Sequence, residues 1–157
     1  MQYFETSEEH TVVNELLLSY KTHSLFSNFS FKSLRSSIDV SRLLRRIWNA
    51  ELNIRESFYL VCFDRAMNVV GYRKIADGGL DSVHVDIRLI FSTALLCKAT
   101  GIIIAHNHPS GTLFPSSADK QLTQRISEVG KLLDISLIEH IILTETSYYS
   151  FRDEGDL

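Results

Sequence analysis

The chain has 157 residues, of which 45% are hydrophobic and 22% are charged, a balance typical of one soluble globular domain. The formal net charge is −3, so the sequence lacks the basic surplus of proteins that bind nucleic acid mainly through phosphates. Cys62 and Cys97 are the two cysteines, and without CxxC spacing they exclude a disulfide framework and a thiolate zinc site. Neither a signal peptide nor an apolar run of about 18 residues is present, so we expect a cytoplasmic protein.

The first 36 residues show no clear hydrophobic period, so we treat them as an N-terminal extension and expect one domain over residues 37–157. From Ser37 onward, apolar residues recur at three- and four-residue spacing, which predicts an amphipathic helix. Ser37 and Asp39 offer side-chain oxygens that can cap its N-terminus. Its buried face is expected to consist of Val40, Leu43, Leu44, Ile47 and Trp48.

Three arginines, Arg42, Arg45 and Arg46, fall on the opposite side of this helix. Arginines in this position usually form a solvated helix face, which is the interpretation we favour. The alternative is a basic surface that contacts phosphate or an acidic partner and gives salt-sensitive DNA binding. Nucleic acid therefore stays open as a partner, although the net charge does not favour it.

The rest of the chain alternates between strand and helix patterns, which predicts an α/β or α+β domain with one mixed sheet. The apolar positions expected to define the second of the later helices are Leu122, Ile126, Val129 and Leu133. We first expect strands at 57–64 and 68–76, joined by a turn at 65–68, and an extended piece at 82–85. A helix at 86–100 follows, capped by Asp86 and ended at Gly101. The remaining elements are a strand at 101–108, a helix after Asp119, a strand at 135–144 and an edge strand at 147–151.

Two histidines at the end of the predicted strand 101–108 are the strongest chemical signal in the sequence. His106 and His108 are two residues apart, and side chains at this spacing point to the same side of an extended chain. Asp119, in the first turn of the next predicted helix, is well placed to supply a third ligand after the loop 109–115. Two nitrogens and one carboxylate oxygen leave a fourth tetrahedral position for water, as in catalytic zinc sites.

A hydrolytic zinc site also needs a carboxylate that takes a proton from the water and passes it to the leaving amine. Glu56 is our candidate, because it precedes a strand that we expect to neighbour residues 101–106. Ser116 lies three residues before Asp119, and its hydroxyl is a candidate for stabilising the oxyanion that forms when water attacks a carbonyl.

Structural explanations exist for the same residues. A lone histidine on a strand is more often structural than a ligand, although two at this spacing after four apolar residues are a less ordinary arrangement. Ser116 and Asp119 also match an N-terminal capping pattern, in which Ser116 caps the helix and Asp119 favours its dipole. Ser116 can serve both roles, whereas a carboxylate that faces solvent cannot bind a metal.

The order and spacing of five residues resembles the metalloprotease signature of the JAB/MPN (JAMM) family: Glu56, then His106-Asn-His108-Pro, six residues, Ser116, two residues and Asp119. The strings AHNHPSG, EHIIL and YYSF are similar to the RadC branch of this family, which carries a DNA-repair name.

The resemblance covers approximately residues 37–155 and implies a cytidine-deaminase-like fold, with a mixed sheet flanked by helices and zinc at its edge. It implies that His106, His108 and Asp119 are the zinc ligands, that Glu56 is the general acid/base and that Ser116 is the hydroxyl on the oxyanion side. Family members with this set cleave amide or isopeptide bonds, so the expected substrate is a peptide or protein.

Two features depart from the RadC branch. Proteins of that branch usually carry an N-terminal helix-hairpin-helix region, which binds DNA. The N-terminal extension shows no sequence pattern of this kind, which weakens the inference of DNA binding. They also tend to have aspartate before the histidine of the last long strand, where this chain has Glu139 and His140. One interpretation of His140 is a residue that supports the site without binding the metal, but we favour a core or edge histidine and leave it out of the catalytic set. A non-catalytic interaction module is a further alternative, and the oligomeric state is left open.

Overall fold

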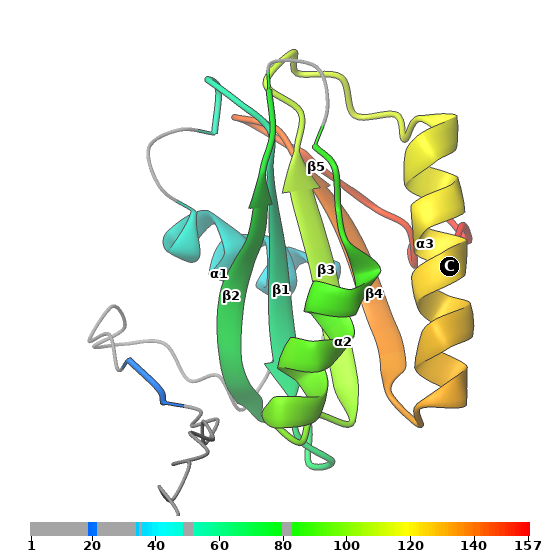
Figure 1. Ribbon diagram of the computed structural model, residues 1–157. Coiled ribbons are helices and arrows are strands. Elements are labelled where there is room, and N and C mark those ends of the chain that lie inside the picture. Colours follow the sequence, from blue (N-terminus) through cyan, green and yellow to red (C-terminus); the bar gives the residue numbers. More distant parts are fainter. Residues whose placement is uncertain (1–18, 22–33, 35, 49–51, 80–82) are drawn as a thin grey trace, which may run out of the picture.

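A five-stranded mixed sheet, in the order β2-β1-β3-β4-β5, organises the protein (Figure 1). The computed structural model describes residues 19–21, 34, 36–48, 52–79 and 83–157, so the predicted N-terminal extension lies almost wholly outside the described residues. The strands are β1 Ser57–Phe63, β2 Val69–Asp77, β3 Gly101–Asn107, β4 Ser136–Leu143 and β5 Tyr148–Ser150, and the helices are α1 Ser37–Ile47, α2 Ile87–Leu96 and α3 Ser117–Leu132.

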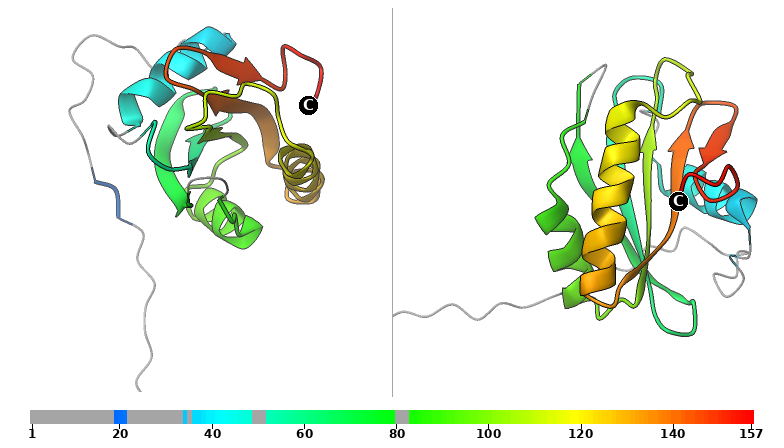
Figure 2. Two further views of the ribbon diagram at one scale, coloured as in Figure 1. Left: turned by 90° about the horizontal axis from the view of Figure 1, so that it is seen from above. Right: turned by 90° about the vertical axis from the view of Figure 1, so that its right-hand side faces the viewer.

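Helices cover both faces of this sheet, with α1 on one face and α2 and α3 on the other (Figure 2). Neighbouring strands are antiparallel except for β3 and β4, which are parallel because α3 carries the chain back between them. This arrangement confirms the predicted α/β class with one mixed sheet flanked by helices. It is consistent with a JAB/MPN-like fold.

The two central strands, β1 and β3, are buried at every position because helices pack against both of their faces. Successive side chains of these strands point to opposite faces of the sheet, so they contribute to two separate hydrophobic cores. The core under α1 contains Val40, Leu43, Leu44, Ile47, Trp48, Tyr59, Val61, Ile103 and Ala105, which includes all five residues predicted for the buried face of this helix. The core under α2 and α3 contains Phe58, Leu60, Ile90, Phe91, Ile102, Ile104 and Ile126.

The predicted helix ends are wrong at two places. The N-cap of α1 is Ser36, whose hydroxyl accepts from the Asp39 amide, rather than Ser37 or Asp39. Helix α2 ends at Leu96 and not at residue 100, because Lys98 adopts a left-handed conformation (φ 56°). The Lys98 amide then donates to Leu95 and the next amide to Ala94, which closes a Schellman turn without glycine.

Two further expectations need correction. Leu133 is not on the buried face of α3, since it follows the helix as its C-cap and is 38% exposed. The part of the predicted extended piece that is described, residues 83–85, has no regular structure and pairs with no strand.

A close backbone approach at Gly130 gives a stability prediction. A Cβ added to Gly130 would lie 2.3 Å from the Ile135 carbonyl oxygen, where the chain folds back after α3. Alanine is favoured over glycine in a helix by about 1 kcal/mol, but here the backbone would have to shift. We expect Gly130→Ala to lower the free energy of unfolding by about 1–3 kcal/mol in urea denaturation. Gly71→Ala is the control, because its Cβ meets Tyr20 at an ordinary 4.0 Å; equal stability of the two variants would contradict the close approach.

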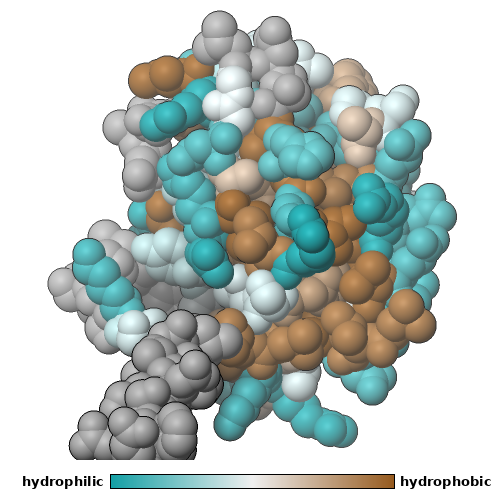
Figure 3. Space-filling view, in the orientation of Figure 1, coloured by the Kyte–Doolittle hydropathy of each residue, from teal (hydrophilic) through white to brown (hydrophobic). Residues whose placement is uncertain are grey.

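The surface over the C-terminal ends of α2 and α3 is apolar (Figure 3). Leu95, Leu96, Leu132 and Leu133 are all exposed there. None of the described helices is long and apolar enough to cross a bilayer. Since α3 runs antiparallel to β3, this apolar surface lies at the end of the molecule opposite to the carboxyl end of β3 (Figure 1).

Candidate metal centre

The carboxyl end of β3 presents His106 and His108 on one side of the sheet. Ile102 and Ile104 pack under α2 and α3, so alternation along the strand turns His106 toward the same face. His108 follows the last residue of β3, but its amide donates to the Leu143 carbonyl at 2.9 Å and keeps it in line with β4. The Nε2 atoms of the two imidazoles lie 3.0 Å apart, as their two-residue spacing predicts.

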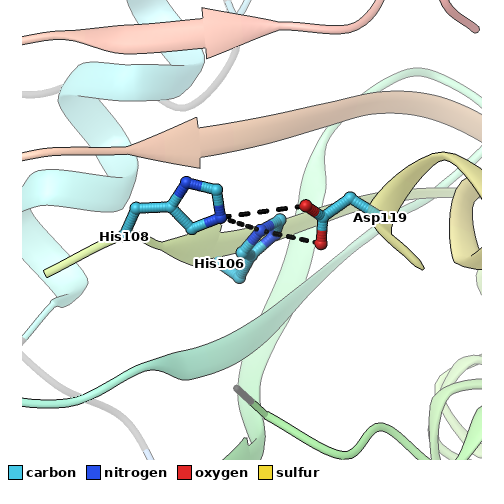
Figure 4. Close-up of side chains that lie close together, drawn as sticks. All are labelled: His106, His108 and Asp119. Carbon is cyan, nitrogen blue, oxygen red and sulfur yellow. Dashed lines mark hydrogen bonds and ion pairs between the residues drawn. The ribbon is translucent and has the colours of Figure 1, made fainter. Parts of the chain in front are cut away.

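Asp119 reaches the two histidines from the first turn of α3 (Figure 4). Its Oδ1 lies 3.2 Å from His106 Nε2, and its Oδ2 lies 3.8 Å from His108 Nε2. The three candidate ligand atoms lie within 4.8 Å of one another, and His106 is buried while the other two side chains are partly exposed. The structure therefore brings together the three residues that the sequence suggests as metal ligands.

The capping role of Asp119 is also present. Its Oδ2 accepts from the Ser116 amide at 2.7 Å and from the Ser116 hydroxyl at 2.6 Å, and the Asp119 amide donates to Ser116 Oγ at 3.1 Å. These contacts form a capping box at the start of α3. The two oxygens of the Asp119 carboxylate thus have different partners. Oδ2 accepts hydrogen bonds from Ser116 at the start of α3, and Oδ1 faces His106. Capping and metal binding are compatible here.

The charges and hydrogen bonds of the cluster favour a cation. Burial raises the pKa of Asp119, but contacts with His106 and Ser116 outweigh it and hold that pKa well below the usual range. His108 Nδ1 lies 2.7 Å from the Thr112 carbonyl oxygen, which only accepts, so Nδ1 carries the hydrogen and donates. Nε2 is therefore the ring nitrogen of His108 that is left to bind a metal, and it faces His106 and the ionised Asp119.

The spacing of these atoms fits a tetrahedral ion. Zinc bonds to nitrogen and oxygen at about 2.0–2.1 Å, so two of its ligand atoms in a tetrahedron are about 3.3 Å apart. His106 Nε2 lies 3.0 Å from His108 Nε2 and 3.2 Å from Asp119 Oδ1, close to that value, and the three candidate atoms all lie within 4.8 Å of one another. Three protein ligands of the types N, N and O are also the usual number at a catalytic zinc.

Glu56 lies at the mouth of β1, and β1 pairs with β3 as expected. Phe58 pairs with His106 at the end of this antiparallel register, and Glu56 lies two residues before Phe58. Alternation along the strand gives Glu56 the same face as Phe58, whose ring stacks on His106 with 6.2 Å between centroids. Glu56 is 9% exposed and is not one of the three clustered ligands.

The segment that carries Glu56 is fixed by Asn107, a residue that the sequence analysis did not single out. Asn107 is fully buried, and its Oδ1 accepts from the Ser57 amide at 2.7 Å. Its Nδ2 donates to the carbonyls of Leu52 at 2.6 Å and Arg55 at 2.9 Å. The middle residue of the His-Asn-His string therefore holds the chain on both sides of Glu56 against β3.

The predicted arginine face is only partly a solvated surface. Arg45 donates to the carbonyl oxygens of Glu145 at 2.8 Å and Ser147 at 2.6 Å, so it is committed to the turn between β4 and β5. Arg42 is exposed and lies 3.8 Å from Asp39 within the same helix. Arg45 is therefore taken out of the basic surface that phosphate binding would require.

The sequence interpretation of His140 was incomplete. His140 is fully buried in β4 and stacks on Phe151, but its Nε2 also lies 2.9 Å from His106 Nδ1. Its other ring nitrogen, Nδ1, lies 2.7 Å from the hydroxyl of Thr123, four residues after Asp119 on α3. Burial lowers the pKa of His140 well below its usual value.

Glu139, the residue that departs from the RadC pattern, has a structural position beside His140. Its carboxylate accepts from the Ser150 hydroxyl at 2.7 Å, from the Arg152 amide at 3.2 Å and from the His140 amide at 2.8 Å. These contacts tie β4 to β5 and to the C-terminal turn. Burial raises the pKa of Glu139.

Comparison with known proteins covers the part of the chain that contains this cluster. The family described as "RadC-like JAB domain" matches residues 34–156. Similar proteins include UPF0758 proteins of Flavobacterium johnsoniae, 42% identical over 79% of this chain and 53% of that protein, and of Thermotoga maritima, 36% identical over 80% and 55%. A UPF0758 protein of Porphyromonas gingivalis is 36% identical over 77% of this chain and 55% of its own length. The chain thus spans about half the length of these relatives, and it belongs to the RadC-like JAB domain family.

Proposed function

We propose that the protein is a zinc-dependent metallohydrolase of the JAMM type, which hydrolyses an amide or isopeptide bond with a metal-activated water. The observation that carries this proposal is the convergence of His106, His108 and Asp119 within 4.8 Å at one end of the sheet. The distances from His106 Nε2 to His108 Nε2 and to Asp119 Oδ1 suit zinc, and the RadC-like JAB domain family matches the part of the chain that contains all three residues.

Each residue of the site has a distinct part in the proposed reaction. His106, His108 and Asp119 hold the ion, which when bound supplies Lewis acidity to the attacking water and to the scissile carbonyl. Glu56, two residues before the Phe58 that pairs with His106, takes a proton from the water and delivers it to the leaving amine.

Two roles are assigned to Ser116, of which the first is supported by its hydrogen bonds and the second is a proposal. Its hydroxyl holds Asp119 Oδ2 at 2.6 Å and so orients a ligand. We propose that this hydroxyl also stabilises the oxyanion, which requires it to turn from Asp119 toward the substrate during the reaction.

The proposed substrate is a peptide or protein, and we place the reaction in the cytoplasm. Both cysteines are free thiols, which suits a reducing compartment. A peptide is favoured over a nucleic-acid substrate, since Arg45 is engaged within the fold and the net charge is −3.

The test is a metal analysis of protein purified without chelator, followed by a screen of peptide and isopeptide-linked substrates. We expect about one zinc per chain, as a single three-ligand site requires, and cleavage that stops when zinc is removed and returns when it is restored. Protein that never acquires stoichiometric metal would exclude the metallohydrolase. Salt-sensitive DNA binding by that metal-free protein would favour a nucleic-acid accessory role instead.

A further inference from the structure

The contacts of His106 continue beyond the ligand cluster into the core. His106 Nδ1 lies 2.9 Å from His140 Nε2, His140 Nδ1 lies 2.7 Å from Thr123 Oγ1, and Thr123 Oγ1 lies 2.6 Å from the Asp119 carbonyl oxygen. His140 is 0% exposed and Thr123 is 2% exposed. These four groups form one buried chain of hydrogen bonds that begins and ends at proposed metal ligands.

The direction of each hydrogen bond follows from the carbonyl at its end. A carbonyl oxygen only accepts, so the Thr123 hydroxyl donates its single hydrogen to Asp119. The hydroxyl oxygen must then accept from His140 Nδ1, which carries a hydrogen. A buried imidazole whose partners are a hydroxyl and another imidazole has no counter-ion, so His140 is neutral.

A neutral imidazole carries one N–H, so His140 Nε2 has a lone pair and accepts from His106 Nδ1. His106 in turn bears a hydrogen on Nδ1, so Nε2 is the ring nitrogen that is left to bind a metal. That Nε2 is the atom that lies 3.0 Å from His108 Nε2 and 3.2 Å from Asp119 Oδ1. His108 reaches the same tautomer more directly, through the Thr112 carbonyl.

We propose that Thr123 and His140 are positioning residues, which fix the tautomer of His106 so that its Nε2 lone pair faces the metal. The proposal rests on the metal site of the proposed function and extends it to two residues that touch neither metal nor substrate. Without the Thr123 hydroxyl, His140 can carry its hydrogen on Nε2 instead and donate to His106. His106 would then hold its hydrogen on Nε2 and lose its place as a ligand. Partners of this kind change metal affinity by about 10–100-fold.

The first test needs no metal. Nitrogen-15 NMR of the imidazoles in metal-free protein at neutral pH reports which ring nitrogen carries hydrogen. We expect a hydrogen on Nδ1 of both His106 and His140, and none on Nε2 of His140. Hydrogen on Nε2 of His140, or no hydrogen on Nδ1 of His106, would overturn the proposal, whether or not the protein binds zinc.

The second test compares zinc affinities by competition with a chelator. Thr123→Val keeps the shape of the side chain and removes the hydroxyl, and we expect about 10–100-fold weaker binding. Thr123→Ser restores the hydroxyl and is expected to restore the affinity. Thr93→Val is the matched control, because Thr93 Oγ1 likewise donates to the carbonyl four residues back, at 2.7 Å from Leu89, but accepts from Arg73 at 2.9 Å.

The outcomes separate the two proposals. Wild-type zinc affinity in folded Thr123→Val protein would show that the hydroxyl has no part in ligand selection. Equal losses in Thr123→Val and Thr93→Val would assign the effect to general destabilisation. Absence of zinc binding in every variant, wild type included, would remove the proposed function, while the NMR result would still decide the tautomer. If Thr123→Val does not fold, Thr123→Ser and the wild-type spectrum carry the test.

Discussion

Replacing His106 with alanine is expected to abolish stoichiometric zinc binding. A four-ligand structural zinc site contributes about 10–16 kcal/mol, so one ligand accounts for about 2.5–4 kcal/mol, or about 10²–10³-fold in affinity. The effect should be at the upper end, because His106 is 2% exposed and its removal also leaves His140 without its partner. Metal content after dialysis and affinity by chelator competition measure the change.

The matched control is His84→Ala, which removes an exposed histidine outside the metal cluster. We expect this variant to retain the zinc content of the wild type. Because a ligand that binds only the folded state stabilises it, chelator should lower the melting temperature of His84→Ala and leave that of His106→Ala unchanged. Equal zinc in both variants would show that His106 is not a ligand.

Replacing Glu56 with glutamine is expected to separate catalysis from metal binding. The amide keeps the size of the side chain but accepts no proton, so hydrolysis should fall by about 10²–10⁴-fold. Zinc content should not change, because Glu56 is outside the cluster of three ligands. The backbone on both sides of Glu56 is held by Asn107 and by pairing with Gly78 and Gly79, so the fold should be unaffected.

This prediction is checked by cleavage rate and zinc content measured on the same preparation. Glu128→Gln is the control, since Glu128 is an exposed residue of α3 that bonds only to Gln124 among the described side-chain contacts. Cleavage by Glu56→Gln at the rate of the control would remove Glu56 from the mechanism. Loss of zinc in Glu56→Gln would instead show that this carboxylate supports the ligands.

The parts of the site that are local in sequence were predictable. The period of two in a strand aims His106 and His108 together, and a helix that starts nine residues after His108 returns Asp119 to them. The alternation of strand and helix patterns likewise predicted the class of fold. These inferences need no knowledge of which strands become neighbours.

The contact between His106 and His140 was not predictable in the same way. It depends on the parallel pairing of β3 with β4, and on a register shift between Ile102 and Ile103 that sets His140 beside Ile104. The end of α2 was missed for a different reason. The residue in the left-handed conformation there is Lys98, whereas glycine is the usual signal for such an end.

The two different contacts of the Asp119 carboxylate affect how relatives of this chain should be compared. A descendant that lost metal binding would still be selected to keep this aspartate, because Oδ2 holds the first turn of α3 through Ser116. The serine and aspartate are therefore poor markers of activity when they occur alone. His106 and His108 have no comparable second duty at a helix end, so their loss is the more informative sign that a relative has become a scaffold.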